Sequence, residues 1–313
     1  MKTEMANIYH NKGQLVYHYT SMDVLKTLIA GIEDNHFVFH GSGLQYMNDS
    51  LEFLHGFCEL RRVLPALEKE LNGLDDDLKI STSIDVADKD LYVKWDKEFV
   101  ETLLQGNMLP FVVSTSANGD NIPMWAMYGN HGHGVSIGLD ISNYYVRTKD
   151  SGGKDVLDFT KYEINSPHAF KVVQNLSLRH PAVSFYSKMI YLEYINKAKQ
   201  IKNDKELGDL KVKSLYEMSV LTSALVKHHA FRFENEWRIL SLATKLDDIH
   251  FKVNSKGNFS PYMNVRIPTS ALRKVIIGPC CEKTYQRNIL MQLLAKHGIA
   301  SCKIVNSKVP YRG

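Results

Sequence analysis

The segment ENEWR, residues 234–238, carries two carboxylates two positions apart and then a guanidinium. Polar and apolar side chains alternate over 231–240, which predicts a β-strand. Alternate side chains of a strand share a face, so Glu234, Glu236 and Arg238 are expected to point the same way. Two neighbouring carboxylates repel each other unless a cation or a reaction uses them. The pair is therefore a candidate for acid–base chemistry, and the alternative is a solvated face with a surface ion pair.

His18 ends a β-branched and aromatic segment, LVYHYT at 15–20, which predicts a strand. Ser21 follows as the N-cap of a helix. A helix N-terminus presents free backbone N–H groups, which suit an anionic ligand. His18 is therefore a candidate binding residue, although a lone histidine is more often a structural one.

Ser114, Thr115 and Ser116 end a second predicted strand, FVVSTS, in which Ser114 and Ser116 share a face. Taken alone, these hydroxyl side chains are more often ordinary strand residues. A second Ser-Thr-Ser at 81–83 lies in a polar segment without strand character, and we interpret it as unrelated to function.

Trp125 and Tyr128 lie three positions apart in the compact segment PMWAMYG, residues 123–129. Two aromatic rings with this spacing can stack on a planar ligand ring, and the alternative is that both belong to the core. Asp49 and Glu52 are interpreted as a capping box that begins a helix reaching about residue 71.

Other motifs of known chemistry are incomplete. The glycines Gly41 and Gly43 follow a predicted strand, but Tyr46 breaks the dinucleotide-binding fingerprint. The chain has no phosphate-binding loop of the GxxxxGK[ST] type and no GxSxG nucleophile motif. The His131-x-His133 and His228-His229 pairs lack further ligands at metal spacing, so no metal site is predicted.

The elements that must position these residues alternate irregularly along the chain. Strands are predicted at 15–20, 36–40, 110–116, 134–140, 231–240, 262–267, 274–277 and 301–305, and helices at 21–31, 49–71, 215–225 and 283–297. Residues 147–166 are expected to be a polar loop, and the Lys-rich stretch 197–213 a solvated helix face. Clustered strands with helices between them predict an α+β fold with a largely antiparallel core.

The composition is that of an ordinary globular protein. The 313 residues carry 38 Lys and Arg against 34 Asp and Glu, a net charge of +4, with 44% hydrophobic residues. No apolar run approaches the roughly 20 residues that span a bilayer, and the N-terminus lacks a signal-peptide core. The low charge argues against a nucleic-acid surface, and four scattered cysteines indicate reduced thiols.

The ordered set of these motifs resembles a known family. The segments YHYTS, MNDSLEF, VVSTS, MWAMYG, GVSIGLD, FENEWRIL and VIIGP span roughly residues 15–280. Together they resemble a bacterial family described as a domain of unknown function, which is similar to the ADP-ribosyltransferase superfamily. The resemblance implies one catalytic domain over 1–313, with helical insertions near 60–108 and 195–230. It also implies a divided, mostly antiparallel β core that binds NAD in a cleft.

The resemblance assigns roles residue by residue. His18, with Tyr19 and Thr20 beside it, matches the motif that binds the ribose and nicotinamide portions of NAD. The Ser-Thr-Ser strand at 114–116 matches the motif that supports the cleft. Trp125 and Tyr128 are candidates for stacking on a ring of NAD.

Glu236 matches the catalytic glutamate, and Glu234 completes an E-x-E pair that is typical of enzymes that modify arginine. One departure is that this pair usually accompanies an arginine at the first motif, where this chain has His18.

The expected function is NAD-dependent mono-ADP-ribosyl transfer, a glycosyltransferase reaction, onto a protein and through an arginine side chain. Such a protein would act as a toxin, effector or defence factor, in its own cytoplasm or after translocation into another cell. NAD is the substrate and no metal is required. Two alternatives remain open: an NAD glycohydrolase, and a catalytically silent module that binds a cationic partner through Glu234 and Glu236.

Overall fold

The structure is a computed structural model that describes most of the chain outside the N-terminal segment. The described residues are 15–44, 47, 52–71, 75–81, 109–141, 147–149, 155–157, 168–173, 187–243, 246–254, 257–299 and 301–311. The strands are β1 Leu15–Thr20, β2 His36–Gly43, β3 Leu109–Ser116, β4 Val135–Asp140, β5 Arg147–Lys149, β6 Asp155–Leu157, β7 His168–Lys171, β8 Glu236–Ala243, β9 Ile249–Val253, β10 Phe259–Pro268, β11 Leu272–Ile277 and β12 Lys303–Asn306. The helices are α2 Met22–Ala30, α3 Glu52–Glu70, α5 Ile122–Met127, α6 Lys188–Ala198, α7 Asp204–Ser223 and α8 Lys283–Lys296, with a 3₁₀ helix, η7, at His229–Glu234.

The fold is α+β, with a mostly antiparallel sheet and flanking helices, as predicted. Eight strands run in the order β12-β11-β4-β1-β3-β2-β10-β9; β8 pairs with β3, and β7 pairs with β8. Within this ten-stranded sheet, β11 and β12 are parallel and the other pairs are antiparallel.

The sheet divides at β3. Strand β8 pairs with the whole length of β3, from Leu109 to Ser116, and so occupies one of its two edges. The other edge is shared: β1 pairs at Ser116, and β2 pairs at Phe111 and Val112. Ser114 therefore lies where the β1 and β2 branches separate. Both branches belong to one ten-stranded sheet.

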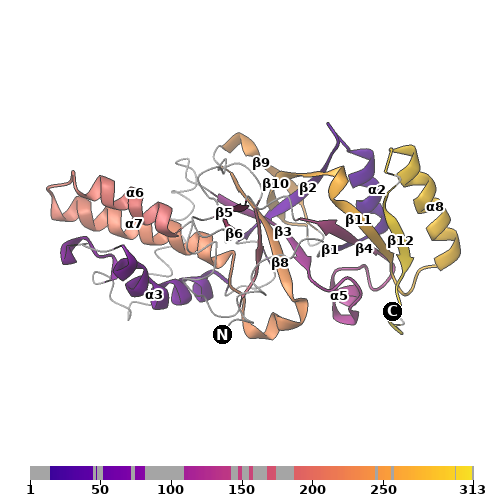
Figure 1. Cartoon of the computed structure of the whole chain (residues 1–313), viewed down its shortest axis with the longest axis horizontal. Coiled ribbons are helices and arrows are strands. Elements are labelled where there is room, and N and C mark those ends of the chain that lie inside the picture. Colours follow the sequence, from indigo (N-terminus) through magenta and orange to yellow (C-terminus); the bar gives the residue numbers. More distant parts are fainter. Residues whose placement is uncertain are drawn as a thin grey trace.

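Two hydrophobic clusters hold the elements together (Figure 1). One packs α2 and α8 against the strands, around Val16, Ile137 and Ile239. The other joins α3, α6 and α7 at the opposite end of the molecule, and it includes Leu240 and Leu242 of β8. Strand β8 contributes to both clusters, which explains why its eight residues are all buried.

Local sequence signals account for several elements. Ser21 caps α2, since its side chain accepts a hydrogen bond from the Val24 N–H, and the predicted Gly31 ends the helix. Leu25, Leu28 and Ile29 are the buried face of α2, as the spacing predicts. The capping box proposed for Asp49 lies outside the described residues.

Two predictions about local structure are wrong. The expected loop at 147–166 contains the antiparallel pair β5 and β6. The Lys-rich stretch 197–213 is not one helix face, because α6 ends at Ala198 and α7 begins at Asp204. Within it Lys211 is buried. Short strands and helix breaks of this kind leave little trace in hydrophobic periodicity.

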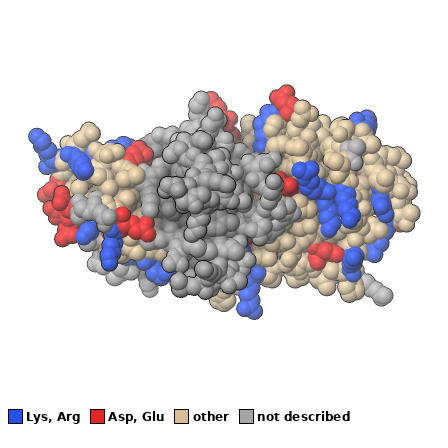
Figure 2. All heavy atoms as spheres, in the orientation of Figure 1, with Lys and Arg blue, Asp and Glu red and all other residues tan. Residues whose placement is uncertain are grey.

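The charges on the face drawn in Figure 2 are unevenly placed. Acidic and basic side chains mix at the end that carries α6 and α7, whereas basic side chains gather toward the end that carries β11, β12 and α8. Arg287, Lys303 and Lys308 line a hollow of about 440 Å³ at that end. Among the helices of the described part of the chain, none combines the length and apolar character needed to cross a membrane.

Candidate active site

Four charged side chains form a cluster that is nearly excluded from solvent. Glu234 is 3% exposed, Glu236 6%, Lys227 6% and Arg238 1%. The alternative of a solvated strand face with a surface ion pair is therefore wrong. Buried charges are retained only when they are paired and hydrogen-bonded, and these four carry two positive and two negative charges.

Lys227 connects the two carboxylates. Its Nζ lies 2.7 Å from Glu234 Oε2 and 3.1 Å from Glu236 Oε2. It also lies 4.9 Å from the centre of the Phe231 ring, a cation–π distance. The second oxygen of Glu234, Oε1, accepts a hydrogen bond of 2.7 Å from the Tyr128 hydroxyl.

Arg238 binds Glu236 through two hydrogen bonds. Nε donates to Oε1 at 2.9 Å, and Nη2 donates to Oε2 at 3.1 Å. Nη1 donates to the Ala224 carbonyl at 2.9 Å, at the C-terminal end of α7. A helix C-terminus has carbonyls without intrahelical partners and favours a cation. Arg238 therefore ties the end of α7 to the start of β8.

The E-x-E pair does not lie on one strand, which corrects the sequence prediction. Glu234 ends η7, Asn235 adopts a left-handed conformation with φ 43°, and β8 begins at Glu236. Hydrogen bonds from residues at the end of β3 hold this turn in place. Its Glu234 carbonyl accepts a hydrogen bond of 2.6 Å from the Ser116 hydroxyl, and its Asn235 carbonyl accepts one of 2.9 Å from the Ala117 N–H. These tertiary contacts override the alternating pattern, yet both carboxylates still reach Lys227.

The neighbours keep the cluster ionised. Burial opposes the charge on Glu236, but Arg238 and Lys227 outweigh burial and hold the pKa of Glu236 below its ordinary value. Burial also opposes the charge on Lys227, but the Glu236 and Glu234 carboxylates outweigh it and raise the pKa of Lys227. Glu236 is therefore a carboxylate and Lys227 an ammonium at neutral pH.

His18 lies at the division of the sheet. Its Nδ1 is 2.9 Å from the Ser114 carbonyl oxygen, so Nδ1 carries the proton and donates it. Burial lowers the pKa of His18, although this hydrogen bond opposes the shift. A neutral His18 protonated on Nδ1 leaves Nε2 as a hydrogen-bond acceptor.

The three hydroxyl side chains of the Ser-Thr-Ser strand differ in their hydrogen-bond partners. Thr115 donates to the Trp237 carbonyl at 2.8 Å, and Ser116 holds the Glu234 carbonyl. The Ser114 hydroxyl is buried without a well-formed hydrogen bond among the described residues, although it is near enough to help lower the pKa of Glu236. The other Ser-Thr-Ser differs: Ser81 bonds Glu68 in the helical cluster, and the rest of it is outside the described residues.

A pocket of about 110 Å³, here called the sheet pocket, gathers most of the predicted site residues. It is lined by Tyr17, His18, Tyr19, Met47, Ser114, Thr115, Met124, Tyr128, Lys227, Glu234 and Glu236. Most of these residues come from β1, β3, α5 with its C-cap and the junction of η7 with β8, and Met47 and Lys227 come from the segments after β2 and α7. The sheet pocket therefore combines a neutral imidazole, a buried serine hydroxyl and two carboxylates that Lys227 bridges.

Three of the predicted site residues do not line the sheet pocket. Thr20 is buried and pairs with Val135 across β1 and β4. Ser116 supports the turn. Trp125 is fully buried in a cluster with Tyr19, where its indole N–H donates to Asp120 at 2.8 Å. This places Trp125 in the core and leaves Tyr128 as the ring that faces the pocket.

Sequence reasoning missed Lys227, the residue that connects the two carboxylates of the charged cluster. Lys227 follows the apolar run that ends α7, which carries no local sign that a lysine there is buried among acids. The surface ion pair that was the alternative for this segment is replaced by a buried one, in which Arg238 pairs with Glu236. Within the described residues, no group of three or more His, Cys, Asp or Glu side chains is arranged to hold a metal ion.

Comparison with known proteins gives a family for part of this site. Residues 124–239 match the family described as a protein of unknown function (DUF2971). No curated protein and no solved structure matches the chain. The matched range contains Tyr128, Lys227, Glu234, Glu236 and Arg238. The chain therefore contains, at residues 124–239, a DUF2971 domain, whose function is unknown.

Proposed function

We propose that the protein is an NAD-dependent mono-ADP-ribosyltransferase that modifies an arginine of a protein target. The observation that supports this most is the convergence of His18, Tyr128, Glu234 and Glu236 on one pocket at the division of the sheet. NAD cleavage needs hydrogen-bonding groups for the nicotinamide and ribose portions and a fixed negative charge beside ribose C1′. The lining of the sheet pocket offers His18, the Ser114 hydroxyl and the Glu236 carboxylate for these tasks.

In the proposed reaction the bond between nicotinamide nitrogen and ribose C1′ breaks, and nicotinamide leaves with the bonding electrons. The ribose becomes cationic, and Glu236 stabilises that charge from an ionised, buried position. Fixed electrostatic groups of this kind are usually the largest catalytic contribution. A guanidinium nitrogen of the acceptor then bonds to C1′, and its proton passes to the Glu234 carboxylate and on to solvent. NAD and the target arginine become nicotinamide and ADP-ribosyl-arginine.

The position of Lys227 restricts how an acceptor arginine could bind. Its ammonium bridges Glu234 and Glu236, the place that an acceptor guanidinium would approach. An acceptor must therefore displace Lys227 from Glu234 or bind beside it. The same pairing is the observation that favours the silent module, because both carboxylates are already neutralised and the sheet pocket is smaller than the roughly 300–1,000 Å³ of ordinary ligand pockets.

The experiment compares Glu234→Gln with Glu236→Gln in the full chain, using labelled NAD and a protein lysate. If Glu236 serves the ribose, Glu236→Gln abolishes both label transfer and release of free ADP-ribose. If Glu234 serves the acceptor, Glu234→Gln abolishes transfer and leaves slow hydrolysis. Wild-type protein that releases ADP-ribose without labelling protein supports the glycohydrolase.

Folding is a separate readout in this experiment, because Glu236→Gln leaves Arg238 without its anion. Circular dichroism and urea unfolding identify a variant that has lost its fold. The double variant Glu236→Gln with Arg238→Gln removes both charges and serves as the folded control. No NAD binding and no product with wild-type protein overturn the proposal and leave the silent module.

A further inference from the structure

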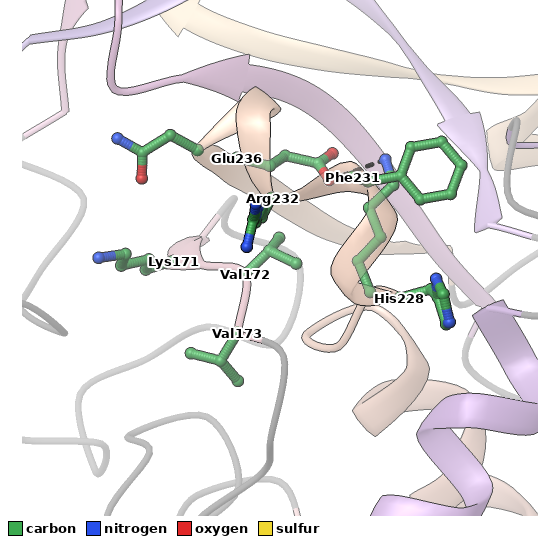
Figure 3. Close-up of a pocket in the computed structure, with 9 residues that line it drawn as sticks. Lys171, Val172, Val173, His228, Phe231, Arg232 and Glu236 are labelled. Carbon is green, nitrogen blue, oxygen red and sulfur yellow. Dashed lines mark hydrogen bonds and ion pairs between the residues drawn. The ribbon is translucent and has the colours of Figure 1, made fainter.

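A second pocket, here called the turn pocket, adjoins the same ion pair. Its volume is about 280 Å³, and it is lined by Lys171, Val172, Val173, Lys227, His228, Phe231, Arg232, Asn235 and Glu236 (Figure 3). Lys227 and Glu236 line the sheet pocket as well. A ligand in the turn pocket therefore lies next to the carboxylate proposed to face the ribose.

The charge of the turn pocket is positive. Lys171 and Arg232 contribute this charge, because Lys227 and Glu236, the other charged residues of the lining, are paired with each other. Glu236 is already bound by Arg238 and Lys227, so its charge is compensated. Figure 3 shows the Glu236 carboxylate directed toward Phe231, on the side away from Lys171.

Arg232 is the side chain best placed to meet an anion. It is exposed and makes no ion pair with the other described residues. Its side chain lines the turn pocket together with Val172 and Lys171 (Figure 3). A guanidinium offers a planar fork of donors that fits two oxygens of a phosphate at once.

Neutral donors and apolar walls complete the pocket. Asn235, in a left-handed conformation with φ 43°, lines the pocket and carries a side-chain amide that can donate hydrogen bonds without adding charge. His228 Nδ1 accepts a hydrogen bond from the Ala230 N–H, so a neutral His228 carries its proton on Nε2 and can donate it. Val172, Val173 and Phe231 are apolar and lower the local dielectric, which strengthens these interactions.

We infer that the turn pocket binds the phosphate or pyrophosphate group of a nucleotide, with Arg232 as its main anchor. A phosphate matches the pocket because its several oxygens can accept from Arg232, Lys171 and the neutral donors together. The inference does not depend on NAD cleavage, since a protein that only bound nucleotides would need the same pocket. The phosphate belongs either to NAD itself or to a separate phosphorylated molecule.

The test is calorimetric titration of the full chain with inorganic pyrophosphate, ADP-ribose and NAD. Wild-type protein is expected to bind pyrophosphate and ADP-ribose, and Arg232→Gln to weaken both at least tenfold. Arg287→Gln is the matched control, because Arg287 is also an exposed arginine that lines a pocket. It should bind as the wild type does. Lys171→Gln is a second variant and is expected to weaken binding several-fold.

The outcomes separate this inference from the proposed function. If Glu234→Gln loses ADP-ribosyl transfer but still binds pyrophosphate, the turn pocket is supported as a phosphate site independently of the proposed activity. Competition between pyrophosphate and NAD identifies the dinucleotide as the source of the phosphate, and simultaneous binding identifies a second molecule. The inference is overturned if wild-type protein binds neither pyrophosphate nor ADP-ribose. It is equally overturned if Arg232→Gln and Arg287→Gln bind alike.

Discussion

Arg238 contributes to stability through its position more than through its charge alone. It is 1% exposed, binds Glu236 twice and closes the end of α7. Removing one partner of a buried pair leaves the other charge without compensation, whereas an exposed pair contributes little. Removing a buried arginine should therefore lower the free energy of unfolding much more than removing an exposed one.

We expect Arg238→Gln to lower the free energy of unfolding by about 3–5 kcal/mol. The control is Arg266→Gln, because Arg266 forms an exposed ion pair with Asp34 at 3.1 Å, and it should change stability by less than about 1 kcal/mol. Urea unfolding monitored by tryptophan fluorescence measures both. Equal effects of the two substitutions would show that the cluster around Glu236 is not a structural unit.

The lowered pKa of His18 predicts how the stability of the folded protein depends on pH. Its pKa is lowered in the folded protein, so the unfolded chain binds a proton more readily below the ordinary value of 6.5. The stabilising contribution is therefore present above pH 6.5 and declines as pH falls toward the folded pKa.

We expect the free energy of unfolding of wild-type protein to fall between pH 7.5 and pH 5.5 more steeply than that of His18→Asn. The difference between the two slopes isolates His18 from other groups, among them His40, whose pKa burial also lowers. Unfolding titrations at several pH values provide the measurement. Parallel slopes would mean that the pKa of His18 is the same in the folded and unfolded states.

The η7 turn shows how a short element can override a pattern of alternating residues. The left-handed Asn235 reverses the chain just before β8, and Ser116 and Ala117 at the end of β3 hold the turn in place. Glu234 and Glu236 thereby approach one ammonium from two directions, which a regular strand would not allow.

Substitutions at Asn235 test this geometry. Asn235→Gly should leave stability within about 1 kcal/mol of wild type, because glycine adopts positive φ without strain. Asn235→Ala should be about 1 kcal/mol less stable than Asn235→Gly, because its Cβ strains the left-handed conformation. Thermal unfolding ranks the three proteins, and an alanine variant as stable as the glycine variant would contradict the turn.

The contact between α3 and α7 depends on a glycine. A Cβ atom placed on Gly56 of α3 would lie 2.4 Å from the Cα of Ser223 in α7, so the two helix backbones approach closely there. Gly208, within α7, has no atom within 4 Å of the same position.

Gly56→Ala should therefore destabilise the protein by about 1–3 kcal/mol through overpacking. Gly208→Ala should stabilise it by about 0.5–1 kcal/mol, because alanine restricts the unfolded chain and favours the helix. Urea unfolding of both variants gives opposite signs if the helices pack as described, and two stabilised variants would contradict the contact.

Strand β8 links the two ends of the molecule and carries the centre of the candidate site. Its apolar residues enter both hydrophobic clusters, while its Glu236 and Arg238 belong to the buried charged cluster. The division of the sheet at β3 opens the space in which His18 meets Ser114. A change in how α7 packs would therefore reach the sheet pocket through Lys227 and Arg238.

Much of this architecture follows from local signals in the chain. Ser21 and the spacing of Leu25, Leu28 and Ile29 define α2, and β-branched and aromatic runs define β1 and β3. The residue types that could do chemistry, above all Glu234 and Glu236, were recognisable because acids two positions apart are costly without a partner. These features depend on a few neighbouring residues, so one segment suffices to predict them.

The partners of those residues could not be predicted in the same way. Lys227 reaches the carboxylates because of how the end of α7 packs. Glu234 lies outside strand β8 because hydrogen bonds from the end of β3 hold the turn that contains it. The division at β3 likewise depends on two strands that compete for one edge. Pairings between segments about 100 residues apart are selected by how the whole chain buries its apolar surface and compensates its charges, and no local pattern encodes that choice.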